Sequence, residues 1–91
     1  MPAERFVVSG VVQGVGFRWW AARTARRLGV TGWVRNRYDG TVEIHAVADL
    51  DVLDAFALAC AEGPRGAQVD EVQRRPDVDE GREGFQQVPT E

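Results

Sequence analysis

The chain contains no lysine, because all eleven of its basic side chains are arginines. Enzymes that form a Schiff base, and P-loop proteins that hold a nucleotide phosphate, need a lysine in the site, so both classes are excluded. Cysteine and histidine are almost as scarce. Cys60 has no partner for a disulfide bond, and together with His45 it offers too few ligands for a zinc site. We therefore expect chemistry without a metal ion or another cofactor.

Long apolar runs are also absent. No stretch approaches the roughly 18 consecutive apolar residues of a membrane-spanning helix, and the first residues lack the layout of a signal peptide. With 91 residues, of which 44% are hydrophobic and 27% charged, the chain is long enough for one packed core and too short for two. We expect one domain over residues 1–91, in a cytoplasmic protein without a membrane partner.

Positive charge is concentrated towards the N-terminus. Residues 1–38 carry seven arginines and a single acid, Glu4, whereas residues 39–91 carry four arginines and thirteen acids. If the N-terminal arginines gather on one face, their field attracts an anionic ligand to that face. The alternative is that these arginines are solvated side chains on the outside of a helix.

The spacing of apolar residues in the first half of the chain predicts one helix among three strands. A strand over Phe6–Val12 precedes a helix over Phe17–Leu28, which Gly29 ends. Two further strands, over Gly32–Asn36 and Thr41–Val47, flank a hairpin turn with an Asp-Gly signal at residues 39–40. Val42, Ile44 and Ala46 are expected to share one face of the third strand.

The second half of the chain repeats this alternation less clearly. Asp49 is a plausible N-cap for a helix that ends at Gly63-Pro64, with an apolar stripe formed by Leu50, Leu53, Phe56, Ala57 and Cys60. Cys60 is then a core residue and chemically inert. Val69 and Val72 mark a fourth strand, followed by an acidic loop over Pro76–Gly84 and a short last strand over Phe85–Val88.

This order of elements is that of the ferredoxin-like fold. We predict an α+β sandwich of βαββαβ type, with two helices on one face of a mainly antiparallel sheet of four to five strands. A right-handed crossover makes the first two strands parallel, and the hairpin places the third between them. The loop after Val12 and the strand end at Asn36 are then about 9 to 10 Å apart.

The segment Gln13–Arg18 is the first candidate site. It opens a helix, where free backbone N–H groups attract anions, and Gly14 and Gly16 let those groups turn towards one point. The alternative is a tight turn that needs glycine for backbone reasons alone. Arg18 lies in the first helical turn, where the dipole disfavours a cation, so either a bound phosphoryl group offsets that cost or Arg18 is a solvated surface residue.

Asn36 is the second candidate. Its amide can orient a water molecule towards phosphorus, or it can simply bond the nearby backbone, as Asn before a turn commonly does. His45 is expected to be exposed or packed rather than catalytic, and Asp39 and Glu43 are interpreted as turn and surface residues. The three tryptophans, Trp19, Trp20 and Trp33, complete the core or rim a groove, and their spacing does not indicate a nucleic-acid partner.

The run from Val8 to Arg18 resembles the first signature of the acylphosphatase family, and Gly32-Trp33-Val34-Arg35-Asn36, with Gly40 and Val42, resembles the second. The resemblance implies hydrolysis of small acyl phosphates to a carboxylate and inorganic phosphate. It implies that Arg18 binds the phosphate and that Asn36 orients the attacking water. It also implies that the phosphate is bound by backbone N–H groups of the loop residues Gln13, Gly14, Val15, Gly16 and Phe17. Ala21 and Ala48 depart from the family pattern without touching either catalytic candidate.

Two other functions remain open from the sequence. The chain could be a non-catalytic module that binds anions in the same cradle. It could also be part of a larger carbamoyl-handling assembly, since it resembles the first domain of the hydrogenase-maturation carbamoyltransferase, although a start at Met1 and the absence of a linker weaken that interpretation. We expect a monomer, but the sequence says little about oligomeric state, because no long apolar surface stripe is left once the core is assigned.

Overall fold

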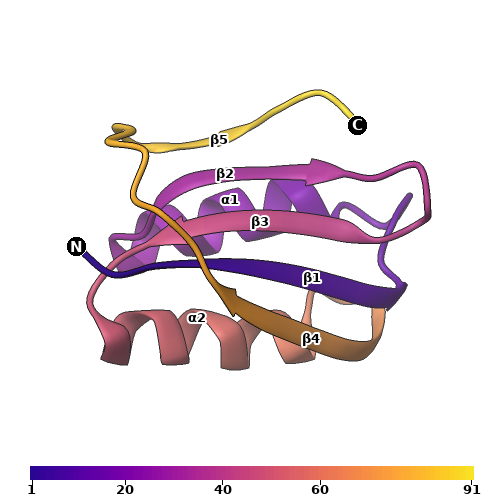
Figure 1. Cartoon of the computed structure of the whole chain (residues 1–91). Coiled ribbons are helices and arrows are strands. Elements are labelled where there is room, and N and C mark those ends of the chain that lie inside the picture. Colours follow the sequence, from indigo (N-terminus) through magenta and orange to yellow (C-terminus); the bar gives the residue numbers. More distant parts are fainter.

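The structure is a computed structural model that describes residues 1–91. It consists of a five-stranded sheet with two helices on one face (Figure 1). The elements follow one another as β1 (Ala3–Val11), α1 (Phe17–Leu28), β2 (Thr31–Asn36), β3 (Val42–Val47), α2 (Leu50–Glu62), β4 (Gln68–Pro76) and β5 (Phe85–Gln87). The ferredoxin-like fold is therefore confirmed. Neither helix is long and apolar enough to cross a membrane.

The strand order is β4-β1-β3-β2-β5, so β3 lies between the parallel strands β1 and β2 as the topology predicted. Three neighbouring pairs are antiparallel, but β5 pairs with β2 in parallel, which makes the sheet mixed. Because β1 and β2 run in the same direction, the loop that follows β1 and the last residue of β2 lie at the same end of the sheet (Figure 1).

The core fills the space between the helices and one face of the sheet. Alternate residues of the strands point into it, including Phe6 and Val8 from β1 and Ile44 from β3, all fully buried. Helix α1 contributes mainly alanines to this core, which lets the helix lie close to the sheet. Val42, Ile44 and Ala46 are all buried there, so the predicted shared face of β3 is confirmed.

The predicted apolar stripe of α2 is wrong at one position. Leu53, Phe56, Ala57 and Cys60 are buried, but Leu50 remains 61% exposed because it is the first residue of the helix and lies at the rim of the core. Asp49 occupies the N-cap position, although its side chain makes no capping hydrogen bond. These differences affect the end of the molecule away from the candidate site.

Gly32 lies where β3 leaves no room for a side chain on β2. Its φ is +138°, and a Cβ atom at this position would lie 1.8 Å from the backbone oxygen of His45. Only glycine fits such a contact. The tight pairing fixes β2 against β3 and so sets where Asn36, at the far end of β2, is held.

Candidate active site

The loop between β1 and α1 presents free backbone N–H groups. Gly14 and Gly16 have φ values of +74° and +78°, in the left-handed region that glycine adopts without strain. Gly16 is the N-cap of α1 and provides no side chain to cap it, and the first turn contains no acidic residue. The positive end of the helix dipole is therefore left uncompensated by the protein itself.

A cavity of about 120 Å³ opens at this helix start. Its lining comes from four parts of the chain, the end of β1 and its loop, α1, β2 and β5, and consists of Val12, Gly14, Gly16, Phe17, Arg18, Trp19, Asn36 and Gln87. The structure thus brings the two predicted catalytic residues, Arg18 and Asn36, into one cavity. Of the predicted loop residues, Gly14, Gly16 and Phe17 line it, whereas Gln13 and Val15 do not.

Arg18 is half-buried at the cavity and forms neither an ion pair nor a side-chain hydrogen bond. Its guanidinium group therefore keeps its planar set of donors free. A cation in the first turn of a helix is disfavoured by about 0.3 to 1 kcal/mol, because the helix dipole places positive charge there. A bound anion removes that penalty and supplies the acceptors that the donors lack.

Asn36 ends β2 with an unsatisfied side chain. Its Oδ1 atom is buried and has no hydrogen-bond partner in the protein. The alternative that the Asn36 side chain bonds the nearby backbone is wrong, because the structure contains no such bond; the backbone carbonyl of Asn36 accepts from the N–H of Glu91 at 3.1 Å. A buried acceptor without a partner is costly and calls for a ligand or water molecule that donates to it.

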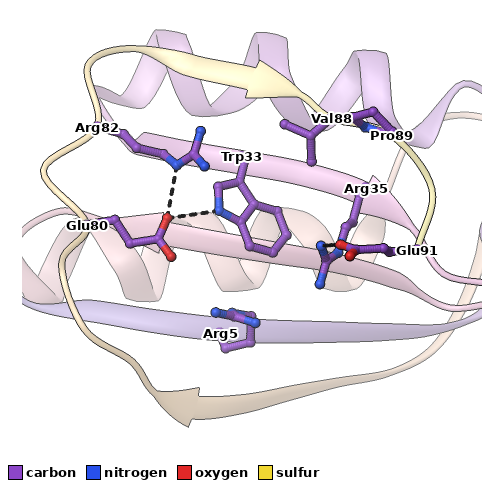
Figure 2. A pocket seen from close by; sticks show the side chains of 8 residues that line it. All are labelled: Arg5, Trp33, Arg35, Glu80, Arg82, Val88, Pro89 and Glu91. Carbon is purple, nitrogen blue, oxygen red and sulfur yellow. Dashed lines mark hydrogen bonds and ion pairs between the residues drawn. The ribbon is translucent and has the colours of Figure 1, made fainter.

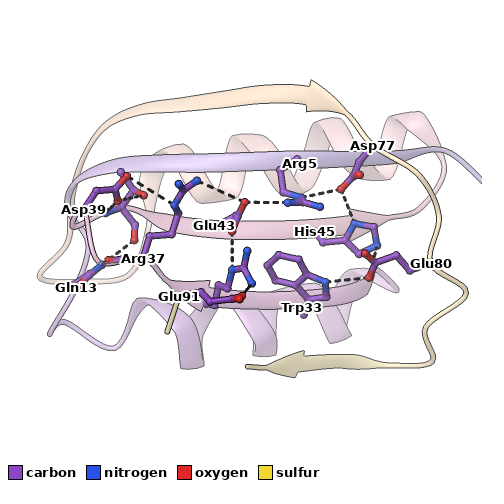
Figure 3. A network of polar contacts seen from close by, with 12 residues as sticks. Arg5, Gln13, Trp33, Arg37, Asp39, Glu43, His45, Asp77, Glu80 and Glu91 are labelled. Carbon is purple, nitrogen blue, oxygen red and sulfur yellow. Dashed lines mark hydrogen bonds and ion pairs between the residues drawn. The ribbon is translucent and has the colours of Figure 1, made fainter. Parts of the chain in front are cut away.

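Gln13 connects the loop to the turn that follows Asn36. Its side-chain amide donates to the backbone oxygens of Arg37, at 2.7 Å, and Thr41, at 2.8 Å (Figure 3). The turn itself is held by Asp39, whose carboxylate accepts from the N–H and the hydroxyl of Thr41, which confirms Asp39 as a turn residue. The side chain of Gln13 is thus engaged away from the cavity.

Sequence reasoning did not assign Val12, Trp19 or Gln87 to the site, and of these Gln87 is the most distant in the chain. It comes from the three-residue strand β5, which reaches the cavity only because it pairs in parallel with β2, with Gln87 opposite Val34. Arg26 of α1 anchors that strand by donating twice to the backbone oxygen of Phe85, at 3.1 and 2.7 Å. No local sequence signal encodes this parallel pairing, since it depends on a loop that crosses the sheet.

A second, larger cavity of about 660 Å³ lies on the face of the sheet that carries no helix, which we call the open face (Figure 2). Trp33 lies between two guanidinium groups there, with the Cζ atoms of Arg5 and Arg35 at 5.0 and 4.6 Å from its ring centroid. Its indole N–H donates to Glu80 at 3.2 Å. Trp33 therefore belongs to the open face and not to the core. Trp20 packs against the core, with its ring centroid 5.3 Å from that of Phe17.

Glu43 is the centre of a network of charges on the open face (Figure 3). It accepts from Arg35 at 2.7 Å and from Arg5 at 3.0 Å, and Arg37 lies 3.7 Å away. The interpretation of Glu43 as a surface residue is wrong, because only 5% of it is exposed beneath these arginines. Burial alone raises the pKa of this carboxyl, but the hydrogen bonds and charges of Arg35 and Arg5 outweigh that effect and lower the pKa.

His45 is fully buried beneath the loop that joins β4 to β5. Its Nδ1 lies 2.8 Å from Asp77, and its Nε2 lies 3.7 Å from Glu80 without a hydrogen bond. Of the two expectations for this residue, the packed one is confirmed. Asp77 also accepts from Arg5 at 2.8 Å, and although burial raises the pKa of Asp77, the bonds from His45, the Val78 N–H and Arg5 lower it overall.

The two cavities therefore differ in how their charges are satisfied. On the open face Arg5 is paired with Glu43 and Asp77, Arg35 with Glu43 and Glu91, and Arg82 with Glu80. In the small cavity Arg18 and the Oδ1 atom of Asn36 have no protein partner. The small cavity is thus the better candidate for a site that binds an anion.

Comparison with known proteins matches residues 4–87 to the family model described as acylphosphatase. A relative named acylphosphatase from Nocardioides sp. is 50% identical, over 86% of this chain and 79% of its own length. Another, from Nitrobacter hamburgensis, is 44% identical over 96% of this chain and 94% of its own length.

Solved structures give the same result at the level of the fold. The acylphosphatase from Bacillus subtilis superposes with a TM-score of 0.93 at 36% identity, covering 97% of this chain and 99% of its own. HypF from T. kodakarensis superposes with a TM-score of 0.86 at 27% identity, but this chain corresponds to only 12% of that protein. The match to the larger protein is therefore confined to a small part of it.

Proposed function

The chain belongs to the acylphosphatase family, and on that premise we propose how its residues carry out the reaction. Membership makes the chain a hydrolase that acts on acyl phosphates. In our proposal the reaction needs no metal ion or cofactor. The loop over Gln13–Phe17 and the Arg18 guanidinium hold the phosphoryl group, while Asn36 orients the attacking water molecule.

Binding of the phosphoryl group rests on donors that are free before substrate arrives. Backbone N–H groups of the loop and of the first turn of α1 donate to phosphate oxygens, aided by the helix dipole. The planar guanidinium of Arg18 donates to two further oxygens and neutralises charge. Together these groups stabilise the negative charge that the equatorial oxygens carry in the transition state.

Asn36 acts on water through the acceptor that lacks a partner. A water molecule that donates to Oδ1 of Asn36 is held facing phosphorus, so that its oxygen attacks in line with the bond to the acyl oxygen. The new phosphorus–oxygen bond forms as the bond to the acyl oxygen breaks, and the bonding electrons leave with the carboxylate. One proton of the water passes to a phosphate oxygen, so the products are a carboxylate and dihydrogen phosphate.

This scheme requires no general acid and no protein base. A carboxylate is a stable leaving group, which departs without being protonated. No histidine or carboxylate lines the small cavity, in agreement with a proton that moves to the substrate's own phosphate. A pH–rate profile that requires an enzyme base with a pKa near neutrality would contradict this step.

The single observation that carries the proposal is the meeting of Arg18 and Asn36 in one small cavity, both with unused hydrogen-bonding groups. We test it by measuring hydrolysis of benzoyl phosphate, with EDTA present, by wild type, Arg18→Ala and Asn36→Ala. Arg27→Ala is the matched control, because Arg27 is an exposed arginine in the last turn of the same helix. Inhibition by inorganic phosphate reports binding separately from turnover.

We expect wild type and Arg27→Ala to turn over the substrate at similar rates. Arg18→Ala should lose both phosphate binding and turnover, whereas Asn36→Ala should lose turnover and keep most of its affinity for phosphate. Full turnover by Asn36→Ala would show that the water is held by another group. Phosphate binding by a folded wild type without hydrolysis would instead select the non-catalytic anion-binding module.

We further propose that the protein acts as a monomer on small acyl phosphates, because Arg18 and Asn36 already meet within a single chain and the proposed reaction needs no residue from a second copy. Size-exclusion chromatography with light scattering during turnover tests this, and an active species that is only ever dimeric would contradict it. Its cytoplasmic location and the absence of a nucleic-acid partner stay predictions.

A further inference from the structure

We propose that the exposed indole ring of Trp19 binds the acyl group of the substrate and makes the enzyme favour acyl phosphates with aromatic acyl groups over acetyl phosphate. The inference rests on the proposed function, because it places the phosphoryl group in the small cavity. It concerns the other half of the substrate, for which the cavity provides no room.

The size of the cavity separates the two halves of the substrate. Pockets that enclose a whole organic ligand usually measure about 300 to 1,000 Å³. The small cavity measures about 120 Å³, and a water molecule takes roughly 30 Å³ of liquid volume. Once it holds a phosphoryl group and the attacking water, the acyl group must lie at the mouth, against whatever surface surrounds it.

Trp19 supplies that surface. It lines the cavity next to Arg18, yet 58% of it is exposed, whereas the other aromatic residue of the lining, Phe17, is buried. An exposed indole ring at the mouth of the cavity offers a flat apolar surface beside the place proposed for the phosphoryl group. Within the small cavity, Trp19 is the only aromatic ring that a ligand can reach from solvent.

The Arg23 guanidinium lies over the indole ring and favours one position of the ring. Its Cζ atom lies 5.3 Å from the Trp19 ring centroid, one helical turn further along α1. A tryptophan has only two rotatable side-chain bonds, so a ring held in this way presents a preorganised surface at little entropic cost. A planar acyl group can pack on this ring in an offset geometry, whereas an acetyl group has no ring to stack.

The effect on kinetics follows from where the contact is made. The contact with the acyl group is similar in the bound substrate and in the transition state, because the reacting phosphorus is elsewhere. Such uniform binding lowers KM and leaves kcat nearly unchanged. Loss of the indole should therefore raise KM for an aromatic acyl phosphate selectively.

The test compares benzoyl phosphate with acetyl phosphate for wild type, Trp19→Ala and Trp19→Phe. Leu58→Ala is the control, because Leu58 is a 71% exposed apolar residue on α2 and does not line the cavity. We expect the ratio of kcat/KM for benzoyl phosphate to that for acetyl phosphate to fall about fivefold in Trp19→Ala, through KM. Trp19→Phe should recover most of the ratio, and Leu58→Ala should leave it at the wild-type value.

Inorganic phosphate, which has no acyl group, distinguishes recognition from a disturbed helix start. Its inhibition constant should change less than the KM for benzoyl phosphate does. An unchanged substrate ratio in an active Trp19→Ala enzyme would overturn this inference alone, as would an equal loss of binding for both substrates and for phosphate. Failure of wild type to hydrolyse either substrate would overturn the proposed function itself.

Discussion

On the open face of the sheet the arginines that line the large cavity each contact a carboxylate, whereas Arg18, in the small cavity, contacts none. Both regions are rich in polar groups, and the open face has the larger cavity and more charges. Yet a guanidinium that is already paired has little to offer a ligand, because the ligand must displace the carboxylate first. Unused hydrogen-bonding groups are therefore a better sign of a binding site than cavity size or charge.

The largest effect is expected when the same conservative change is made in both regions. Arg18→Lys should lower kcat/KM for benzoyl phosphate by about 100- to 1,000-fold, because an ammonium group cannot replace two parallel guanidinium donors on a phosphate. Arg5→Lys should retain nearly full activity, since Arg5 pairs with Glu43 and Asp77 away from the small cavity. Equal losses in the two variants would erase the distinction between the regions.

Removal of the central carboxylate of the open face should affect stability and leave chemistry unchanged. Glu43→Gln should lower the free energy of unfolding by about 2 to 3 kcal/mol, because the charges of Arg5 and Arg35 lose their shared partner. Urea denaturation measures this loss, with turnover per folded molecule as the second readout. Asp70→Asn is the control, because Asp70 is an exposed carboxylate of β4 and should change stability by less than about 0.5 kcal/mol.

Lowering the pH should have a smaller effect on the free energy of unfolding. The pKa values of Glu43 and Asp77 are lower in the folded state than their ordinary values of 4.5 and 3.8, so both groups bind fewer protons folded than unfolded. Their contribution to stability is complete above the unfolded-state pKa values and is lost as the pH falls through the folded-state values. Denaturation at several pH values should show stability declining below about pH 5, with a shallower decline in Glu43→Gln. If stability declined equally steeply with falling pH in wild type and in Glu43→Gln, Glu43 would not be the group that causes the decline.

The smallest effect on activity is expected from a thiol reagent, because Cys60 is buried on the helix side of the sheet. Burial raises the pKa of its thiol to about 12, and the side chain is fully buried between α2 and the sheet. Little thiolate exists at neutral pH, so iodoacetamide should leave the folded protein unmodified and fully active. Mass spectrometry should find one alkylated thiol only after denaturation. Rapid alkylation of the native protein would show that α2 opens locally.

The elements that the sequence predicts best are those with local signals at both ends. The predicted bounds of α1, Phe17 and Leu28, are confirmed because Gly16 and Gly29 adopt left-handed conformations on either side of an apolar stripe. The meeting of Arg18 and Asn36 follows from topology, since parallel strands with one strand between them end at the same edge. Their catalytic roles stay predictions.

The open face shows where such reasoning fails. Arg5 and Asp77 are separated by 72 positions in the chain, and the link from Trp33 to Glu80 spans 47. A polar residue on an alternating strand such as Glu43 looks solvent-exposed until the arginines of neighbouring strands cover it. Gln87 reaches the small cavity through a parallel strand pair of the same long-range kind. Contacts of this kind depend on the assembled fold.

The two hydrogen bonds of Gln13 give the small cavity a mechanical property. They fasten the loop over Gln13–Phe17 to the turn after Asn36, so in our proposal the groups that bind the phosphoryl group and the water are tied to each other. The gap between them is then set before substrate arrives, and little reorganisation accompanies the reaction. Because both acceptors are backbone oxygens, these two bonds do not themselves depend on which side chains stand at positions 37 and 41.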